Sequence, residues 1–231
     1  MRHPLITVLL ICPLLCARLA LAQAEAAPVD RAIAAYAEGR LAEAARDFER
    51  LARQGQPLAQ YNLAMMALRD EGVRGGPQRA RQLLESAAAR HFVRAELALG
   101  DLYEQGALGR PDPAKALPWY QRAAEHGSVD AQLNVATAYF LGRGTRQDFA
   151  QAALWYREAA KGGDVGAQYL LASLYEKGEG LPQDLRLARY WYGIAADNGD
   201  KAAPFKREEL DRLLAAEAER AAEAASAPTA R

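Results

Sequence analysis

The chain has 231 residues, 51% of them hydrophobic, and its 29 basic and 29 acidic side chains balance each other. This balance excludes a strong attraction to phosphate backbones, and with it sequence-independent nucleic-acid binding, and it argues against wholesale disorder. Alanine, leucine and arginine dominate while β-branched residues are scarce, so the composition favours helices over a large sheet.

Residues 1–22 have the pattern of a secretory signal peptide. Arg2 gives a basic start, an apolar run extends from Leu5 to Leu15, and Ala20-Leu21-Ala22 is a small-residue cleavage signal. A retained membrane anchor is the alternative, but the run is short for a span and Arg18 interrupts its far side. We therefore expect a periplasmic or secreted protein whose mature part does not insert into the membrane.

Both cysteines, Cys12 and Cys16, lie inside the predicted signal peptide. Cleavage after residue 22 would leave a chain without cysteine and therefore without a disulfide. Leu15 stands before Cys16, where a lipoprotein signal needs a small residue, so we do not expect lipid attachment. Residues 23–29 are predicted to be a short linker.

The rest of the chain repeats with a period of 36 residues, which is the pattern of a stacked array. Several kinds of residue recur in one common phase, too many for accidental self-similarity. They include Ala59, Ala95, Ala131, Ala167 and Ala203; Tyr103, Tyr139 and Tyr175; Gly106, Gly142 and Gly178; and the pairs Trp119-Tyr120, Trp155-Tyr156 and Trp191-Tyr192.

Each repeat is predicted to be two helices, here called the first and second helix of a hairpin. In the third repeat, the first helix is expected from about Asp130 to Leu141, and Gly142 ends it because glycine adopts the left-handed conformation of a helix end. The second helix follows Asp148, a capping residue, and Gln151 completes a capping-box pattern. Alanine, tryptophan and tyrosine at helical spacing then form its buried face.

The first helices share a capping residue and a small residue at equivalent positions. A small residue there allows the two helices of a hairpin to approach closely, and a single hairpin cannot bury its apolar face alone. We therefore predict an all-α fold, a right-handed superhelix or solenoid of stacked antiparallel hairpins, with a concave surface lined by first helices. The caps are Ser128, Asp164 and Asp200, and the small residues are Ala64, Gly100, Ala136 and Ala172.

The recurring pattern A-x3-[LV]-[GA]-x2-Y-x2-G, followed by D-x3-A-x2-WY-x2-AA-x2-G, resembles the Sel-one-like repeat, a relative of the tetratricopeptide repeat. The resemblance implies four repeats, at residues 57–92, 93–128, 129–164 and 165–200. The first of them is degenerate, because Leu83-Leu84 replaces the tryptophan-tyrosine pair.

The segments that flank the four repeats are predicted to protect the ends of the array. Residues 30–56 resemble a tetratricopeptide hairpin and would form the N-terminal cap. Residues 201–220 would form a C-terminal capping helix, with Leu210, Leu213 and Leu214 as its apolar stripe. Residues 221–231 are expected to be a disordered tail.

The resemblance implies a non-enzymatic adaptor or scaffold of the bacterial cell envelope that binds another protein. A special case is an accessory subunit of an envelope or export assembly. The alternative is a cell-wall or β-lactam-binding hydrolase, as the cysteine-rich branch of the family suggests. Ser128 is explained as a helix cap, and neither it nor Ser173 has a histidine at a neighbouring repeat position. His91 and His126 are interpreted as charges at helix C-termini. We thus predict no catalytic, cofactor-binding or metal-binding residue.

The candidate partner-binding residues lie on the first helices, where the resemblance implies a concave groove for an extended or helical peptide. Phe140 is the most informative of them, because a large apolar group at that position needs either a neighbour or a partner. In chain order they are Met65, Arg69, Arg94, Asp101, Glu104, Asp130, Thr137, Phe140, Ser173, Glu176 and Lys177.

Overall fold

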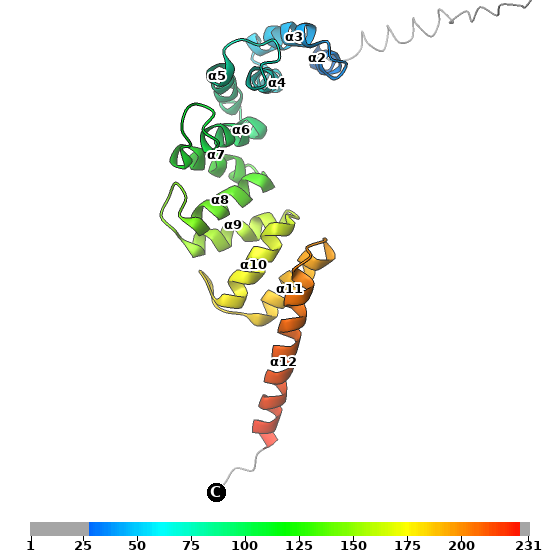
Figure 1. The fold of residues 1–231 in the computed structure, drawn as a ribbon, viewed down its shortest axis with the longest axis vertical. Coiled ribbons are helices and arrows are strands. Elements are labelled where there is room, and N and C mark those ends of the chain that lie inside the picture. Colours follow the sequence, from blue (N-terminus) through cyan, green and yellow to red (C-terminus); the bar gives the residue numbers. More distant parts are fainter. Residues whose placement is uncertain (1–27, 227–231) are drawn as a thin grey trace, which may run out of the picture. The chain divides into compact units, whose positions relative to one another are not determined.

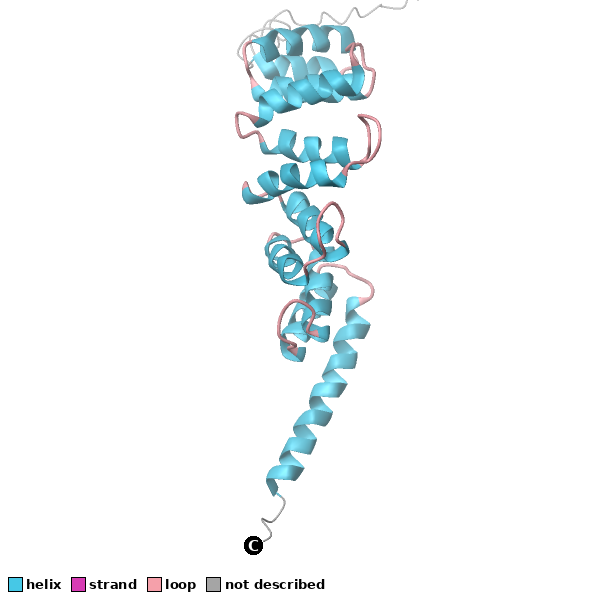
Figure 2. Cartoon of the chain, turned by 90° about the vertical axis from the view of Figure 1, so that its left-hand side faces the viewer, coloured by secondary structure: helices cyan, strands magenta, loops and turns pink. Residues whose placement is uncertain are grey.

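The computed structural model describes residues 28–226, and every regular element in this range is a helix (Figures 1 and 2). The predicted signal peptide lies outside the described residues, as does the end of the predicted tail. No described helix is both long and apolar enough to span a membrane. The helices are α2 (Pro28–Ala37), α3 (Leu41–Arg53), α4 (Pro57–Leu68), α5 (Gly76–Ala88), α6 (Val93–Glu104), α7 (Pro113–Glu125), α8 (Val129–Leu141), α9 (Phe149–Lys161), α10 (Val165–Lys177), α11 (Leu185–Asp197) and α12 (Ala203–Ser226).

The described chain divides into two compact units, with the boundary after Ala87. In the first unit, α2 and α3 form a hairpin, and α4 packs against α3. Phe48, Leu51 and Leu63 are almost completely buried there. Residues 28–53 therefore form a helix hairpin, and its first helix begins at Pro28, within the predicted linker.

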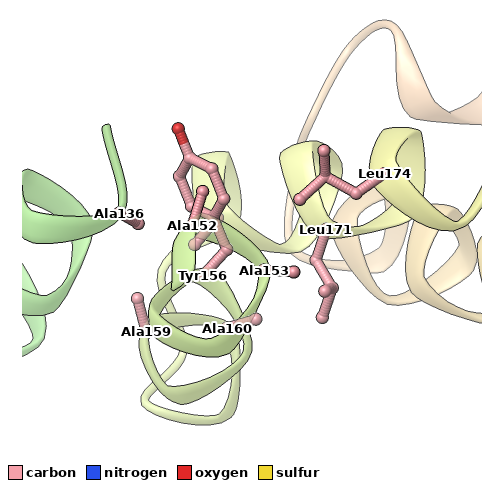
Figure 3. Packing of buried hydrophobic residues seen from close by; sticks show 9 residues of the cluster. Ala136, Ala152, Ala153, Tyr156, Ala159, Ala160, Leu171 and Leu174 are labelled. Carbon is pink, nitrogen blue, oxygen red and sulfur yellow. The ribbon is translucent and has the colours of Figure 1, made fainter. Parts of the chain in front are cut away.

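The second unit is a stack of three hairpins followed by α12. The hairpins are α6–α7, α8–α9 and α10–α11, and the second helix of each packs against the first helix of the next. Figure 3 shows α9 with Tyr156 and its alanines between Ala136 of α8 and Leu171 and Leu174 of α10. The predicted all-α architecture of stacked antiparallel hairpins is confirmed.

The predicted capping residues begin the helices as expected. The Ser128 hydroxyl accepts a hydrogen bond from the backbone N–H of Ala131, and the Asp164 carboxylate caps α10 in the same way. Asp148 accepts from two N–H groups of the first turn of α9. Gly142 ends α8 with a φ of +69°, in the left-handed region where a side chain would be disfavoured.

The small residue of each first helix faces the tyrosine of the same hairpin. A Cβ at Gly100 would overlap the ring of Tyr120. Ala136 packs in one cluster with Tyr156, while the half-buried Trp155 belongs to two neighbouring clusters and joins consecutive hairpins. The tyrosine thus fills its own hairpin, and the tryptophan packs against two neighbouring core clusters.

The loops after α8 and α10 are packed against the preceding hairpin. A Cβ at Gly144 would overlap the backbone of Pro113, and one at Gly180 would overlap that of Phe149. Both glycines also have a positive φ. Both glycines therefore allow a close approach between hairpins, whereas the helices themselves end at Gly142 and Gly178.

The C-terminal helix α12 is longer than predicted and continues to Ser226. The predicted end at residue 220 is wrong, because residues 221–225 are alanine and glutamate, both strong helix formers, and no breaker occurs before Pro228. The predicted apolar stripe is also only partly buried. Leu210 is buried against α10 and α11, whereas Leu213 is 45% exposed.

Candidate partner-binding surface

Three predicted residues occupy equivalent positions on α6, α8 and α10, and each lies beside the tyrosine of its own hairpin. The Tyr120 hydroxyl donates to Asp101 over 2.9 Å. Thr137 Oγ1 and the Tyr156 hydroxyl share a hydrogen bond of 3.3 Å, and Ser173 interacts with the hydroxyl of Tyr192. These side chains are half-buried, so each presents only part of its surface to a partner.

The position three residues later, held by Glu104, Phe140 and Glu176, is half-buried as well. Glu104 forms a 2.8 Å ion pair with Arg143 from the next repeat. Phe140 makes edge contacts with Phe149 and Tyr156, at centroid distances of 5.3 and 6.3 Å. Phe140 thus has neighbours within its own hairpin and does not require a partner to cover it.

The exposed predicted residues of the second unit are Arg94, Asp130 and Lys177. Burial raises the pKa of Asp101, the hydrogen bond from Tyr120 opposes this rise, and the negative charge of Asp130 adds to it. Among residues 28–226, neither Asp101 nor Asp130 has an ion-pair partner. The result is a local excess of negative charge at Asp101 of α6 and Asp130 of α8.

A small cavity of about 90 Å³ opens between the α6–α7 hairpin and α8. Glu104 and Thr137 line it, together with Tyr120, whose hydroxyl binds Asp101. Its wall also includes Arg143 and Asn134, two residues that sequence reasoning missed. Arg143 lies in a loop, and only a search of loop positions for charges facing the preceding repeat could have found it.

Met65 and Arg69 belong to the first unit and line a separate hollow of about 140 Å³ there. Arg69 donates a 2.8 Å hydrogen bond to the Tyr36 hydroxyl, which in turn donates to Glu71 over 2.8 Å. Arg69 is therefore exposed but already fixed in position by its own unit.

The first unit also has a larger groove, of about 1000 Å³, along α3. Arg46, Arg50 and Arg53 line it from one face of this helix, while Glu49 pairs with Arg53 and Arg79, each over 3.2 Å. This basic groove contains none of the predicted partner-binding residues. The i, i+4 and i+7 spacing of the three arginines was the signal that could have found it.

Residues 57–91, 93–128, 129–164 and 165–200 each match the family model of the Sel1 repeat. The chain belongs to the Sel1 repeat family. Sel1 repeat proteins typically serve as protein-interaction scaffolds, and the helical stack described above is the architecture that such a scaffold needs.

Two solved structures are similar to this Sel1 repeat protein. One is a Sel1 repeat protein from Oxalobacter formigenes, with 34% identity and a TM-score of 0.66, covering 73% of this chain and 49% of that one. The other is a protective antigen of uropathogenic Escherichia coli with an SLR fold, with 31% identity and a TM-score of 0.68, covering 72% of this chain and 36% of that one. This chain thus spans about half of the first and about a third of the second. The search of curated proteins found no match.

The Sel1 repeats of the second unit combine a constant frame with variable surface positions. The tyrosines of the second helices and the alanines around them are buried in every repeat. By contrast, the residues beside the tyrosine hydroxyls are an aspartate, a threonine and a serine. These positions therefore differ in chemistry from hairpin to hairpin, while the frame around them stays the same.

Proposed function

We propose that this chain is a non-enzymatic adaptor of the bacterial cell envelope and that it binds a partner polypeptide along α6, α8 and α10. Membership in the Sel1 repeat family supports the protein-binding part of this proposal, since Sel1 repeats typically bind proteins. Variable, partly exposed side chains on a rigid repeated frame are the usual basis of selective peptide recognition.

The observation that carries the proposal is the uncompensated negative charge of Asp101 and Asp130. Burial and the neighbouring charge disfavour the ionised form of Asp101, and a cation from a partner would relieve both effects. The adjoining cavity also has apolar walls, from Leu117 and Ala138. We infer a partner segment that places lysine or arginine at the aspartates and a small apolar group beside it.

Selection from a random peptide display library tests this proposal. The immobilised chain should enrich peptides with a basic residue next to apolar ones, and Asp130→Lys should abolish that enrichment. Asp197→Lys is the matched control, because Asp197 is exposed on the second helix α11 and the substitution changes the charge equally. Equal enrichment by the wild-type chain and Asp130→Lys would contradict the proposed surface.

The envelope location follows from the predicted signal peptide at residues 1–22, which lies outside the described residues. Capture from an envelope extract, followed by mass spectrometry, would identify the natural partner. We expect one prominent protein to bind the wild-type chain and Asp197→Lys but not Asp130→Lys. A protein captured by all three would have bound elsewhere on the chain.

A further inference from the structure

A glutamine near the start of the first helix recurs in three of the four Sel1 repeats; Gln60 and Gln168 are buried, and Gln132 is half-buried. In each, its side-chain Nε2 donates to the backbone carbonyl of the residue eight positions earlier, at the end of the preceding helix. The second repeat breaks this pattern with Glu96, which is completely buried. The three regular pairs are Gln60 to Ala52, Gln132 to Ala124 and Gln168 to Ala160, at 3.2, 3.3 and 3.2 Å.

A carboxylate cannot donate this hydrogen bond, and Arg122 of α7 replaces the glutamine as donor. Its guanidinium donates to the carbonyl of Ala88 over 3.2 Å and to Glu96 Oε1 over 3.0 Å. The other carboxylate oxygen, Oε2, lies 2.7 Å from Nδ1 of His126. One oxygen of Glu96 is thus neutralised by the arginine, while the other faces a histidine.

A second histidine, His91, also departs from the repeat. The equivalent position is glycine everywhere else, and all of these residues have a positive φ. His91 keeps a φ of +59° although a residue with a Cβ is disfavoured there. A histidine kept in a disfavoured conformation suggests that the imidazole has a role of its own. The equivalent glycines are Gly55, Gly127, Gly163 and Gly199.

The two departures from the repeat, Glu96 and His91, both lie beside His126. The ligand atoms of His91, Glu96 and His126 all lie within 4.8 Å of one another. The two imidazole rings are in edge contact, with a centroid distance of 5.4 Å. Both histidines are exposed while the carboxylate is buried, so an ion could enter from solvent and reach an anionic ligand.

We propose that His91, Glu96 and His126 form a binding site for a divalent transition-metal ion of the zinc class. Two imidazoles and one carboxylate are a ligand set that Zn²⁺ accepts, with a further position open to water. The metal would replace the hydrogen bond between His126 and Glu96 Oε2. The ligands come from the turn after α5, from α6 and from the end of α7, so the ion would clamp the α6–α7 hairpin to the turn before it.

Arg122 sets the expected strength of this site. Its positive charge, 3.0 Å from Glu96 Oε1, opposes the charge of the metal ion. Arg122 also holds the carboxylate in place through its hydrogen bond, as residues that contact metal ligands commonly do. The Arg122 guanidinium is itself positioned over Trp119, 5.0 Å from the ring centroid. We therefore expect weaker binding than at a closed structural zinc site.

Calorimetric titration of the full-length chain, without a histidine tag, with ZnCl₂ tests the proposal. The informative variants restore the residues of the other repeats: His91→Gly and Glu96→Gln. We expect one Zn²⁺ per wild-type chain, and binding at least about tenfold weaker in each variant. Thermal unfolding followed by circular dichroism should show a larger Tm increase with Zn²⁺ in the wild type than in either variant.

Two controls keep the test decisive. His3, Cys12 and Cys16 are present in every variant, so zinc bound by them would not distinguish wild type from variant. Glu125→Gln removes an exposed carboxylate next to the site and should leave binding unchanged. If Glu96→Gln fails to fold, His91→Gly decides alone, because it restores glycine at a position with positive φ. Zinc binding that is absent from the wild type, or equal in wild type and His91→Gly, would overturn the proposal.

Discussion

The hydroxyl of Tyr192 donates a 2.6 Å hydrogen bond to the carboxylate of Glu176. Lys206 of α12 binds the same carboxylate over 3.0 Å, so Glu176 joins α10, α11 and α12. A residue that the sequence analysis assigned to the partner-binding surface therefore also supports the end of the stack. This double role affects how substitutions on the first helices must be interpreted.

Replacing Tyr192 with phenylalanine should destabilise the chain by about 1–2 kcal/mol, since it removes a hydrogen bond to a charged group in a mostly buried setting. Tyr156→Phe is the comparison, and it should cost less, about 0.5 kcal/mol, because its partner Thr137 is neutral and 3.3 Å away. Urea unfolding measures both values. Equal losses of unfolding free energy in the two variants would show that the bond to Glu176 stabilises the fold no more than the bond to Thr137.

The stability contributed by Glu176 should depend on pH. Burial alone would raise its pKa, but the hydrogen bonds from Tyr192 and Lys206 outweigh burial, and the pKa is lowered. The contribution is therefore present above the unfolded-state value for glutamate, about 4.3, and is lost as the pH falls through the lower folded-state value. Glu176→Gln should remove this acid-sensitive part from a series of unfolding curves between pH 7 and pH 3. An unchanged pH profile in the variant would contradict the assignment.

Asp101 should behave in the opposite way. Its pKa is raised, chiefly by burial, so its ionised form opposes folding at neutral pH and this penalty disappears as the pH falls. Asp101→Asn keeps an oxygen that can accept from Tyr120 and should leave stability at pH 7 unchanged or higher. A clear loss of stability at pH 7, measured by the same urea unfolding, would mean that the ionised carboxylate of Asp101 stabilises the folded state.

Gly100→Ala should destabilise the second unit, by about 1 kcal/mol. Alanine gains up to about 1 kcal/mol in helix propensity, but its Cβ would overlap the ring of Tyr120, and overpacking costs about 1–3 kcal/mol. The ring cannot shift freely, because its hydroxyl is bonded to Asp101. Ala136→Gly at the equivalent position should also be destabilising, through lost propensity. A stabilised Gly100→Ala would show that the ring has room to move.

The predicted signal peptide can be tested by fusing the full chain to alkaline phosphatase, which is active only after export. We expect enzyme activity from the wild-type fusion and its loss when Leu9 or Leu10 in the apolar run is changed to arginine, because a charge there interrupts the run. Lys161→Arg, far from the segment, should have no effect. Equal activity with an arginine in the run would contradict export by this segment.

The fold could be predicted from the sequence because its signals are local and repeated. Ser128, Asp148 and Gly142 mark helix ends by their own chemistry, and the period of 36 residues fixes the phase of the buried alanines. The end of α12 could not be predicted as well, because a small-residue segment at a chain end is typical of a tail, although alanine and glutamate at residues 221–225 also continue a helix.

The candidate site was less predictable, because it depends on contacts between elements. The sequence placed Asp101 and Glu104 on a first helix, but it could not reveal that Tyr120 and Arg143 bind them. His91 and His126 were interpreted as helix-end charges, because Glu96 lies on another helix and only folding brings its carboxylate next to them. Comparing each repeat position for lost glutamines and glycines would have drawn attention to this cluster.

The central claim is that α6, α8 and α10 bind a basic polypeptide segment through Asp101 and Asp130. Its most direct test is the calorimetric affinity of one enriched basic peptide for the wild-type chain, Asp130→Lys and Asp197→Lys. We predict at least about a tenfold loss of affinity for Asp130→Lys, equivalent to about 1.4 kcal/mol, and no change for Asp197→Lys. Equal affinity for all three chains would contradict the account.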